Sequence, residues 1–427
     1  MRGSDSKIIG NVKNSPGCAR RATCRLAAPK LLLSEVMMDS DELAAWLRLV
    51  LTPGLGRAQA RRLLAAAGSP QAVFELGAEA LAGLAGSATG SIPLPANWPE
   101  PVQTTLAWLD GGADRFVFAL GDEGYPPALL DIDDPPLLLF AMGTQARRWA
   151  EGEHESQHWL AMVGSRNPTP QGLMHARQFA QALAQQGVGI VSGLALGIDG
   201  ASHEGALAAG GSTVAVVGTG LDRVYPRRHL DLARRIVGSG AIVSEFALGT
   251  PPLAHHFPQR NRILAGLARA TLVVEANLQS GSLITARLAA EQGKEVMAIP
   301  GSIDSLQSRG CHQLIIEGAR LVTAVQDVLE ELDIIAPDAS ADTSADASRA
   351  RARRLDETQA DPQGLEPASA EDAALLRALG FEPTGLDALQ ACCGWPTERL
   401  QARLLELELD GQLARLPGGL FQRLVRA

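Results

Sequence analysis

The chain has 427 residues, 46% of them hydrophobic, so it is long enough for several domains with buried cores. It contains no run of about 18 apolar residues, which argues against a membrane span. Its five cysteines lack the spacing of a zinc site or a disulfide framework, a usage typical of the reducing cytoplasm. The formal net charge is −9, yet residues 158–322 hold 14 Lys and Arg against 10 Asp and Glu, so DNA is an admissible partner for that region.

The first 37 residues differ in composition from the rest. Three of the four lysines, Lys7, Lys13 and Lys30, lie there, and the segment lacks the apolar stretch of a secretory signal. Two interpretations of residues 1–37 stay open: a disordered basic tail, or a start codon assigned too early.

Residues 38–115 are expected to form small helices. Leu43, Trp46 and Leu47 have helical spacing, and residues 52–57 read Thr-Pro-Gly-Leu-Gly-Arg, a tight turn between two helices. This pattern resembles helix-hairpin-helix (SAM-like) domains, in which the turn amides grip a DNA phosphate. A helical bundle whose turn does not touch DNA is the favoured alternative.

From residue 116 onwards, short apolar runs alternate with helical patterns. Strands are expected at 116–120, 137–140, 160–163, 188–191, 213–217, 241–244, 271–275 and 295–299, and helices at 170–186, 199–209, 226–237, 260–268 and 282–292. Buried strands separated by helices predict an α/β fold, in which a doubly wound parallel sheet is covered on both faces.

Small and polar residues gather where the expected parallel strands end. The relevant turns are Gly164-Ser165-Arg166, Ser192-Gly193, Gly218-Thr219-Gly220 and Ser280-Gly281-Ser282. Glycine allows close backbone approach, and hydroxyls with free helix amides form a cradle for an anion. One such turn is ordinary in an α/β protein, but several at one sheet edge favour a phosphate or phosphodiester site.

Residues 257–267 read FPQRNRILAGL and mark the expected start of a helix. Phe257 is suited to stacking on a nucleobase, while Arg260 and Arg262 are suited to holding phosphate. For these residues alone, an ordinary helix start with solvated arginines and a core phenylalanine is equally open.

Other ligand classes fit the sequence less well. It contains no complete dinucleotide fingerprint and no phosphate-binding loop ending in Gly-Lys-Ser/Thr, and neither His203-Glu204 nor His255-His256 has the company of a metal site. Asp199, Glu245 and Glu275 are candidates for hydrolysis, but no nucleophile, base and orienting group stand together. The sequence therefore indicates a binding site without catalytic residues, metal or cofactor.

The C-terminal part divides into two segments. Residues 334–370 are rich in Ala, Asp, Ser and Pro, and are expected to be a disordered linker. Residues 371–427 suggest three helices, at 373–379, 386–392 and 397–409, and a hairpin made of 412–416 and 420–424, which is the pattern of a winged helix. Duplex reading is one option for this domain. A protein-interaction or structural role is favoured, because residues 397–409 carry more acidic than basic side chains.

Residues 116–332 resemble the DNA-processing protein DprA (Smf) family. The matching motifs are VGSR at 163–166, SGLALGID at 192–199, GTGLD at 218–222, YP at 225–226, SE at 244–245, FPQRNRILAGL at 257–267, SGSLITA at 280–286 and IPG at 299–301. The resemblance implies an extended Rossmann-like domain at 116–333. It also implies a cytoplasmic, dimeric protein that binds and protects single-stranded DNA and loads the RecA recombinase onto it during natural transformation.

The same resemblance implies roles for individual residues. Arg166 is expected to hold phosphate, Phe257 to stack on a base, and Arg260, Asn261 and Arg262 to engage the strand. The cradle around them is expected to be lined by Gly164, Ser165, Ser192, Gly193, Ser280, Gly281 and Ser282.

Two positions depart from the family pattern, and two alternatives stay open. Leu196 stands where many members carry Lys or Arg, and His312 stands where Asn is usual. Leu314 and Ile315 are expected either to form the family's dimer surface or to pack internally. The rival function is that of a nucleotide-cleaving phosphoribohydrolase on a related fold, whose Pro-Gly-Gly-x-Gly-Thr turn is absent from the expected sheet edge.

Overall fold

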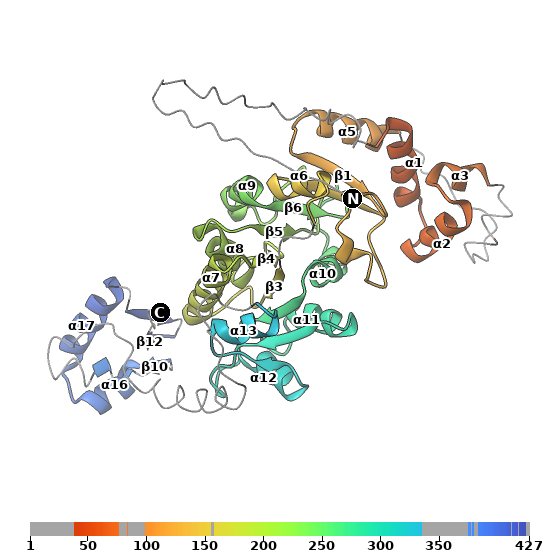
Figure 1. The fold of residues 1–427 in the computed structure, drawn as a ribbon. Coiled ribbons are helices and arrows are strands. Elements are labelled where there is room, and N and C mark those ends of the chain that lie inside the picture. Colours follow the sequence, from red (N-terminus) through yellow and green to blue (C-terminus); the bar gives the residue numbers. More distant parts are fainter. Residues whose placement is uncertain are drawn as a thin grey trace, which may run out of the picture. The chain divides into compact units, whose positions relative to one another are not determined.

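The computed structural model describes residues 38–76, 83, 99–154, 158–334, 375–376, 378–379, 383–410, 412–416 and 418–423. The expectations for residues 1–37, and for all but the first residue of the linker 334–370, lie outside these residues. Figure 1 labels the helices and strands.

The region that follows residue 38 is helical, as predicted. Its helices are α1 (Ser40–Leu51), α2 (Arg57–Ala67), α3 (Pro70–Glu75) and α5 (Pro99–Asp110). The Asp39 carboxylate caps α1 by accepting the backbone N–H of Glu42 at 2.7 Å. Gly54 has a φ of 77°, a left-handed conformation that lets the chain turn tightly between α1 and α2.

A nine-stranded mixed sheet occupies the centre of the described chain. Its strands are β1 (Arg115–Ala119), β2 (Leu138–Met142), β3 (Trp159–Val163), β4 (Gly189–Ser192), β5 (Thr213–Val216), β6 (Ala241–Ser244), β7 (Ala270–Val273), β8 (Glu295–Ala298) and β9 (Arg320–Leu321). Their order is β1-β2-β6-β5-β4-β3-β7-β8-β9. Strands β3 to β9 run parallel, whereas β2 is antiparallel to both β1 and β6. The doubly wound parallel sheet is confirmed, with an antiparallel edge.

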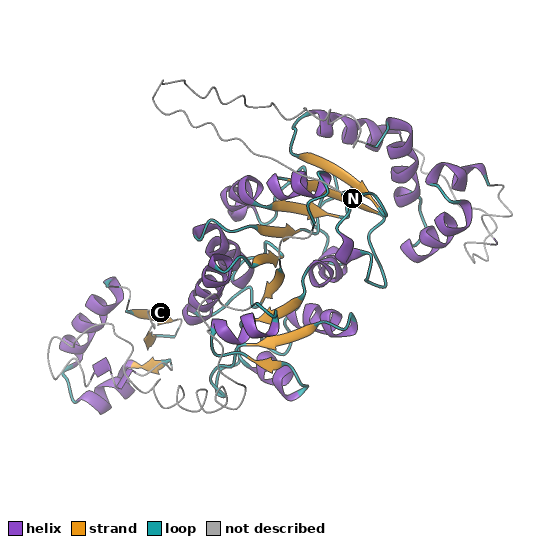
Figure 2. Cartoon of the chain, in the orientation of Figure 1, coloured by secondary structure: helices purple, strands orange, loops and turns teal. Residues whose placement is uncertain are grey.

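Helices cover both faces of this sheet (Figure 2). They are η2 (Pro127–Leu129), α6 (Thr144–Ala150), α7 (Pro170–Gln185), α8 (Ile198–Ala208), η3 (Arg227–His229), α9 (Leu230–Ser239), α10 (His256–Leu267), α11 (Ser282–Glu291), α12 (Arg309–Ile316) and α13 (Val325–Glu331). Helix α10 begins four residues before the predicted helix, so Phe257 lies in its first turn rather than in a loop.

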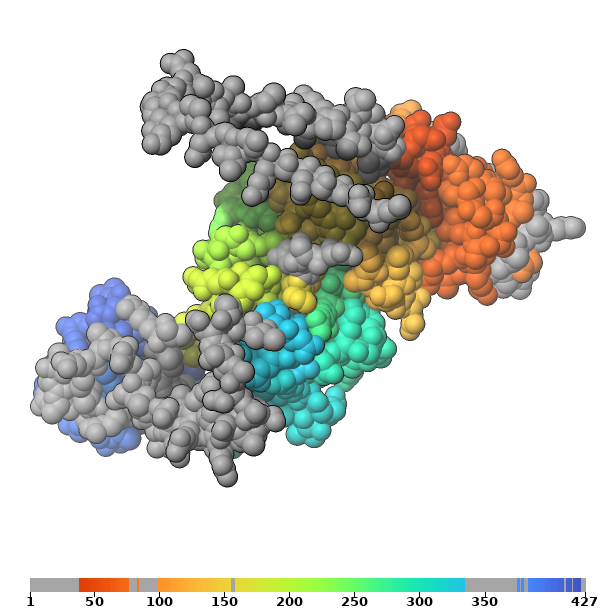
Figure 3. Space-filling model, in the orientation of Figure 1, coloured from red at the N-terminus to blue at the C-terminus, as the bar shows by residue number. Residues whose placement is uncertain are grey.

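Successive side chains of β3 point to opposite faces of the sheet, so a separate hydrophobic core lies on each face. Leu160 and Met162 are buried in a cluster with residues of α7, α8 and α13, whereas Ala161 and Val163 point into a second cluster with residues of α10 and α11. In the space-filling view, the green to cyan segments that carry α10 to α12 lie against one another (Figure 3).

The order of strands creates a switch point in the middle of the sheet. The chain runs from β3 outwards to β6, and β7 then pairs with the other side of β3. The connections after β3 and β7 therefore lead to opposite faces of the sheet, which leaves a crevice beyond the carboxyl ends of these strands. Ligands of α/β proteins bind in such crevices.

The C-terminal part has its own small core. It contains β10 (Thr384–Gly385), α16 (Leu386–Cys393), α17 (Thr397–Leu409), β11 (Leu413–Leu416) and β12 (Leu420–Arg423), with the strand order β10-β12-β11. Leu389, Leu400, Leu404 and Phe421 are buried together. Two helices followed by an antiparallel hairpin agree with the predicted winged helix. Only residues 375–376 and 378–379 of the predicted first helix are described, and they are helical.

Candidate nucleic-acid interface

A cavity of about 680 Å³ opens at the switch point. Its walls come from the end of β3, the loops that follow β3, β4, β5, β6 and β7, helices α10 and α11, and the loop before α12. The residues that line it are Val163, Gly164, Ser165, Arg166, Asn167, Ala195, Asp199, Tyr225, Pro252, Ala254, Phe257, Pro258, Arg260, Asn261, Leu264, Asn277, Gln279, Ser280, Gly281, Ser282, Ile284, Thr285 and Gln307.

An exposed arginine and two aromatic rings stand together at this cavity. The Arg166 guanidinium carbon lies 5.5 Å from the centre of the Phe257 ring, and the Tyr225 ring centre lies 5.6 Å from that of Phe257. Tyr225 is 48% exposed, so its ring is accessible to a ligand. Sequence reasoning placed Tyr225 in a matching motif but gave it no role, although a tyrosine after a glycine-rich strand end was an available signal.

A second arginine, Arg260, is buried against the floor of the cavity. Its Nη2 donates to the Gly193 carbonyl at 3.0 Å, while its Nε and Nη1 make no hydrogen bond within the described chain. Burial lowers the pKa of Arg260 to about 10, so the group stays charged at neutral pH. Unpaired buried donors are costly, and an anion in the cavity would satisfy them.

The carboxylate of Asp199 organises the loop beneath Arg260. Its Oδ2 accepts the backbone N–H groups of Gly193 at 3.1 Å and of Ala195 at 3.3 Å. Burial raises the pKa of Asp199. Among the lining residues, the charged side chains are therefore Arg166, Arg260 and Asp199, which leaves a net positive cavity when all three are ionised.

Hydroxyl groups and a helix start complete the polar lining. Ser280 and Ser282 share a hydrogen bond of 2.5 Å between their Oγ atoms at the start of α11. The Ser165 Oγ accepts the backbone N–H of Asn167 at 3.1 Å. The first backbone N–H groups of α11 already have partners, since that of Ser282 donates to the Ser280 Oγ at 3.3 Å and that of Leu283 to the Ser280 carbonyl at 3.2 Å, so the serine hydroxyls are the polar groups that this edge offers.

Most predicted site residues meet at the cavity, but three do not line it. Ser192 is fully buried, and its Oγ donates to the Met162 carbonyl at 2.6 Å. Gly193 acts indirectly, because a Cβ there would collide with the Arg260 guanidinium. Arg262 lies on the other side of α10. The turn 218–220 is also outside the cavity, and Gly218 packs against Phe257.

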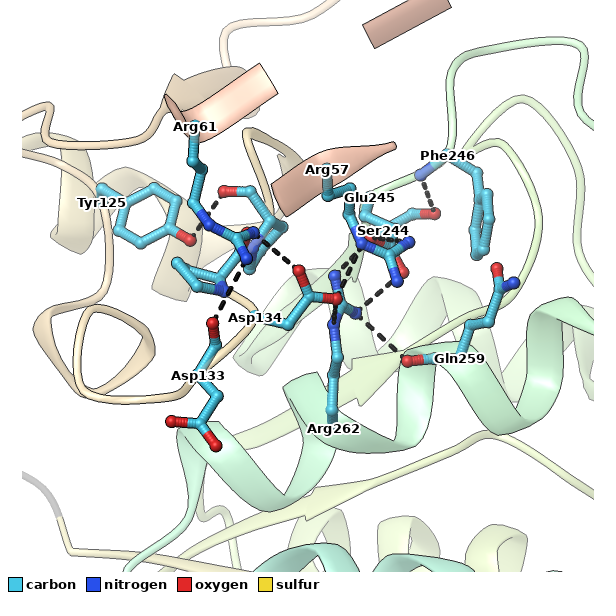
Figure 4. A network of polar contacts seen from close by, with 12 residues as sticks. Arg57, Arg61, Tyr125, Asp133, Asp134, Ser244, Glu245, Phe246, Gln259 and Arg262 are labelled. Atoms are coloured by element: carbon cyan, nitrogen blue, oxygen red, sulfur yellow. Dashed lines mark hydrogen bonds and ion pairs between the residues drawn. The ribbon is translucent and has the colours of Figure 1, made fainter. Parts of the chain in front are cut away.

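Arg262 is engaged by protein carboxylates rather than facing the cavity (Figure 4). It donates through both terminal nitrogens to Glu245, at 2.9 and 2.7 Å, and through Nε to Asp134 at 2.9 Å. Although burial alone would lower the pKa of Arg262, the two carboxylates outweigh it and raise the pKa. Arg262 therefore lies outside the cavity with its charge paired, and its contact with a DNA strand stays a prediction.

For Leu314 and Ile315, a dimer surface and internal packing were both open. Leu314 is buried in the main core and Ile315 packs partly against it, so internal packing is the right interpretation for Leu314. Ile316 is 79% exposed at the end of the same helix. Leu196 is exposed but does not line the cavity.

The candidate acids and histidines are engaged elsewhere. His203 is buried, bonds to the Thr213 hydroxyl at 2.7 Å through Nδ1, and has its pKa lowered by burial to about 3. Glu275 accepts the backbone N–H of Thr169 at 3.0 Å, and burial raises its pKa to about 7.

Among the described residues, no three His, Cys, Asp or Glu side chains gather as metal ligands, and no helix could cross a membrane.

The fold and the cavity define an α/β protein with an arginine-lined cavity at the switch point of a Rossmann-like sheet. Residues 116–333 match the family described as DNA recombination-mediator protein A, and residues 359–419 match the DprA winged helix domain. The chain therefore belongs to the DprA (Smf) family of DNA recombination mediators.

Individual relatives agree with this assignment. Protein Smf of Escherichia coli K12 is 42% identical over 334 residues, which cover 77% of this chain and 82% of the relative. DNA processing protein DprA of Streptococcus pneumoniae R6 is 46% identical over 217 residues, covering 51% of this chain and 74% of the relative. The X-ray structure of DprA from Streptococcus pneumoniae superposes with a TM-score of 0.56 at 38% identity, covering 69% of this chain and 98% of that one.

Proposed function

We propose that the cavity binds single-stranded DNA. The observation that carries this proposal is the presence in one cavity of the accessible rings of Phe257 and Tyr225 and of a buried arginine, Arg260, whose Nε and Nη1 have no partner among the described residues. Phosphate groups suit the first feature, and nucleobase faces suit the second. Bases in a duplex are stacked on their neighbours, so only an unpaired strand offers a free face to these rings.

Each lining group has a part in the proposed complex. Arg166, exposed at the mouth, receives one phosphate, and Arg260 receives an anionic oxygen deeper in the cavity. The hydroxyls of Ser165, Ser280 and Ser282 complete the phosphate cradle. Asn261 lines the same wall and offers an amide to a base edge.

The wider role we propose is that of a recombination mediator. The protein protects single-stranded DNA and loads RecA onto it during natural transformation, in the cytoplasm and as a homodimer. Membership of the DNA recombination-mediator family supports this role. We further propose that the site binds without cleaving, because the carboxylates of Asp199 and Glu275 already accept backbone N–H groups.

The binding experiment compares equal lengths of labelled single-stranded and duplex DNA by gel shift. We expect the single strand to be shifted at far lower protein concentration, and RecA filaments to form faster on protein-coated strands. Equal affinity for duplex would contradict the cavity as the site. Turnover of nucleoside monophosphates by the purified protein would favour the phosphoribohydrolase alternative.

A further inference from the structure

Behind the cavity, the opposite side of α10 takes part in a network of five charged side chains (Figure 4). Asp134, in the loop between β1 and β2, accepts Arg57 Nε at 2.8 Å, Arg61 Nη1 at 2.6 Å and Arg262 Nε at 2.9 Å. Glu245, which follows β6, accepts Arg262 at 2.7 Å and Arg57 at 3.4 Å. The network thus joins α2 of the N-terminal helices to the helix that carries the cavity wall.

This network differs from ordinary surface ion pairs in burial and geometry. The side chains of Arg262 and Glu245 are 9% and 5% exposed, and they meet as two parallel hydrogen bonds. Burial alone would raise the pKa of Asp134, but the three arginines outweigh it and lower the pKa. Planar, bidentate pairs fix direction as well as distance, so the network defines where Arg262 lies.

Helix α10 is short, and side chains of other elements hydrogen-bond to its backbone, so we expect its residues to move together. Arg262 lies two positions after Arg260, and α10 also carries Phe257 into the cavity. Gln292 donates to the Arg262 carbonyl at 3.2 Å, and Lys294 donates to the last carbonyls of α10, those of Ala265 and Gly266. Because Phe257, Arg260 and Arg262 belong to one short helix, a displacement of α10 at Arg262 would also displace the cavity wall.

We propose that Asp134, held by Arg57 and Arg61 of α2, is a positioning residue that sets α10 for binding single-stranded DNA. This inference rests on the proposed function. The helix-hairpin-helix pattern suggests that the turn between α1 and α2 binds a DNA phosphate, whereas in this proposal the region of that turn holds α10 in position. Arg57, at the start of α2, lies where such a motif would bind a phosphate, but it forms ion pairs with Asp134 and Glu245 instead. The N-terminal helices thereby act on DNA through α10 and not by direct contact.

The sign of the effect of Asp134→Asn on affinity tests this inference. Removing a negative charge near a DNA site strengthens binding if only long-range electrostatics matters. Positioning predicts the reverse, a loss of roughly tenfold in affinity for oligo-dT, because the carboxylate that all three arginines share becomes a neutral amide with a single acceptor oxygen. Asp133→Asn is the matched control: it removes the same charge one residue earlier, at an exposed side chain directed away from Arg61 (Figure 4). It should bind as tightly as wild type or slightly more tightly.

A double-mutant cycle with Phe257→Ala separates positioning from damage to the fold. If Asp134 acts through α10, Asp134→Asn costs much less affinity when Phe257 is already absent. Loss of folded protein instead lowers the number of binding sites equally in both backgrounds. Arg61→Gln removes one arginine from the carboxylate and should give a smaller loss with the same dependence on Phe257, which covers the case in which Asp134→Asn does not fold.

The two proposals fail differently in this experiment. Wild type that does not prefer single-stranded DNA overturns the proposed function. Wild type that binds, is weakened by Phe257→Ala, and yet gives equal affinities for Asp134→Asn and Asp133→Asn overturns the positioning role alone. Additive effects in the cycle overturn it as well.

Discussion

The guanidinium of Arg260 lies directly over Gly193 and donates to its carbonyl at 3.0 Å. A Cβ at position 193 would collide with both terminal nitrogens of Arg260, so any larger residue there would displace the guanidinium. Gly193, which follows β4, thus leaves room for the Arg260 guanidinium and does not itself line the cavity.

Gly193→Ala should displace Arg260 without changing any charge. We expect about a tenfold loss of affinity for oligo-dT, the scale of one charged hydrogen bond, measured by fluorescence anisotropy. Gly238→Ala is the control, since nothing lies within 4 Å of a Cβ at that exposed helical position. Wild-type affinity in Gly193→Ala would show that the position of Arg260 does not matter for binding.

Phe257→Ala should remove a stacking surface. Affinity is expected to fall by about 1–3 kcal/mol with little change in its salt dependence, because no phosphate contact is lost. Tyr225→Ala tests the residue that sequence reasoning left without a role, and a smaller loss is expected because its ring is half exposed. If both variants bind like wild type, the aromatic pair is not part of the site.

Glu275→Gln should alter the pH dependence of stability. The folded-state pKa of Glu275 is about 7 against an ordinary value of 4.5, so the folded protein takes up a proton more readily than the unfolded chain. The stability contributed by Glu275 is complete below about pH 4.5 and is lost as the pH rises towards 7. A neutral glutamine avoids this loss and should gain up to roughly 3 kcal/mol at pH 8.

Urea unfolding at pH 5 and pH 8 measures this difference. Glu295→Gln, at the exposed start of β8, is the control and should differ from wild type equally at both pH values. A Glu275→Gln advantage that is the same at pH 5 and pH 8 would contradict the linkage.

Deletion of residues 371–427 should leave most single-strand binding intact. Every residue that lines the cavity falls between Val163 and Gln307, outside the winged helix. Anisotropy titrations of the shortened and full chains should give affinities within about threefold of each other. That difference is smaller than the change in affinity expected from the loss of one good contact. Loss of binding in the shortened chain would mean that the winged helix supplies the DNA site.

Much of the fold follows from local patterns in the chain. The runs at 213–216 and 241–244 are apolar, short and bounded by turns, and they form β5 and β6 almost as predicted. Arg166 and Ser282 line the same cavity because the carboxyl ends of parallel strands lie at one edge of the sheet. These features depend on residues close in sequence, or on a general property of parallel sheets.

The different roles of Arg260 and Arg262 could not be predicted in the same way. Two residues apart on a helix, they point to opposite sides. Which side faces the cavity depends on Asp134, 128 residues before Arg262, and on Glu245. The burial of Leu314 likewise depends on the distant strands against which α12 packs.

The salt dependence of oligo-dT binding, for wild type and for Arg166→Ala, tests the cavity as a single-strand site most directly. If Arg166 holds a phosphate, the variant binds more weakly, and the slope of log affinity against log salt becomes shallower by about 0.7, the value for one phosphate of a single strand. Arg177→Ala, at an exposed residue of α7, should leave both quantities unchanged. An Arg166→Ala protein with wild-type affinity and slope would contradict the assignment of this cavity to DNA.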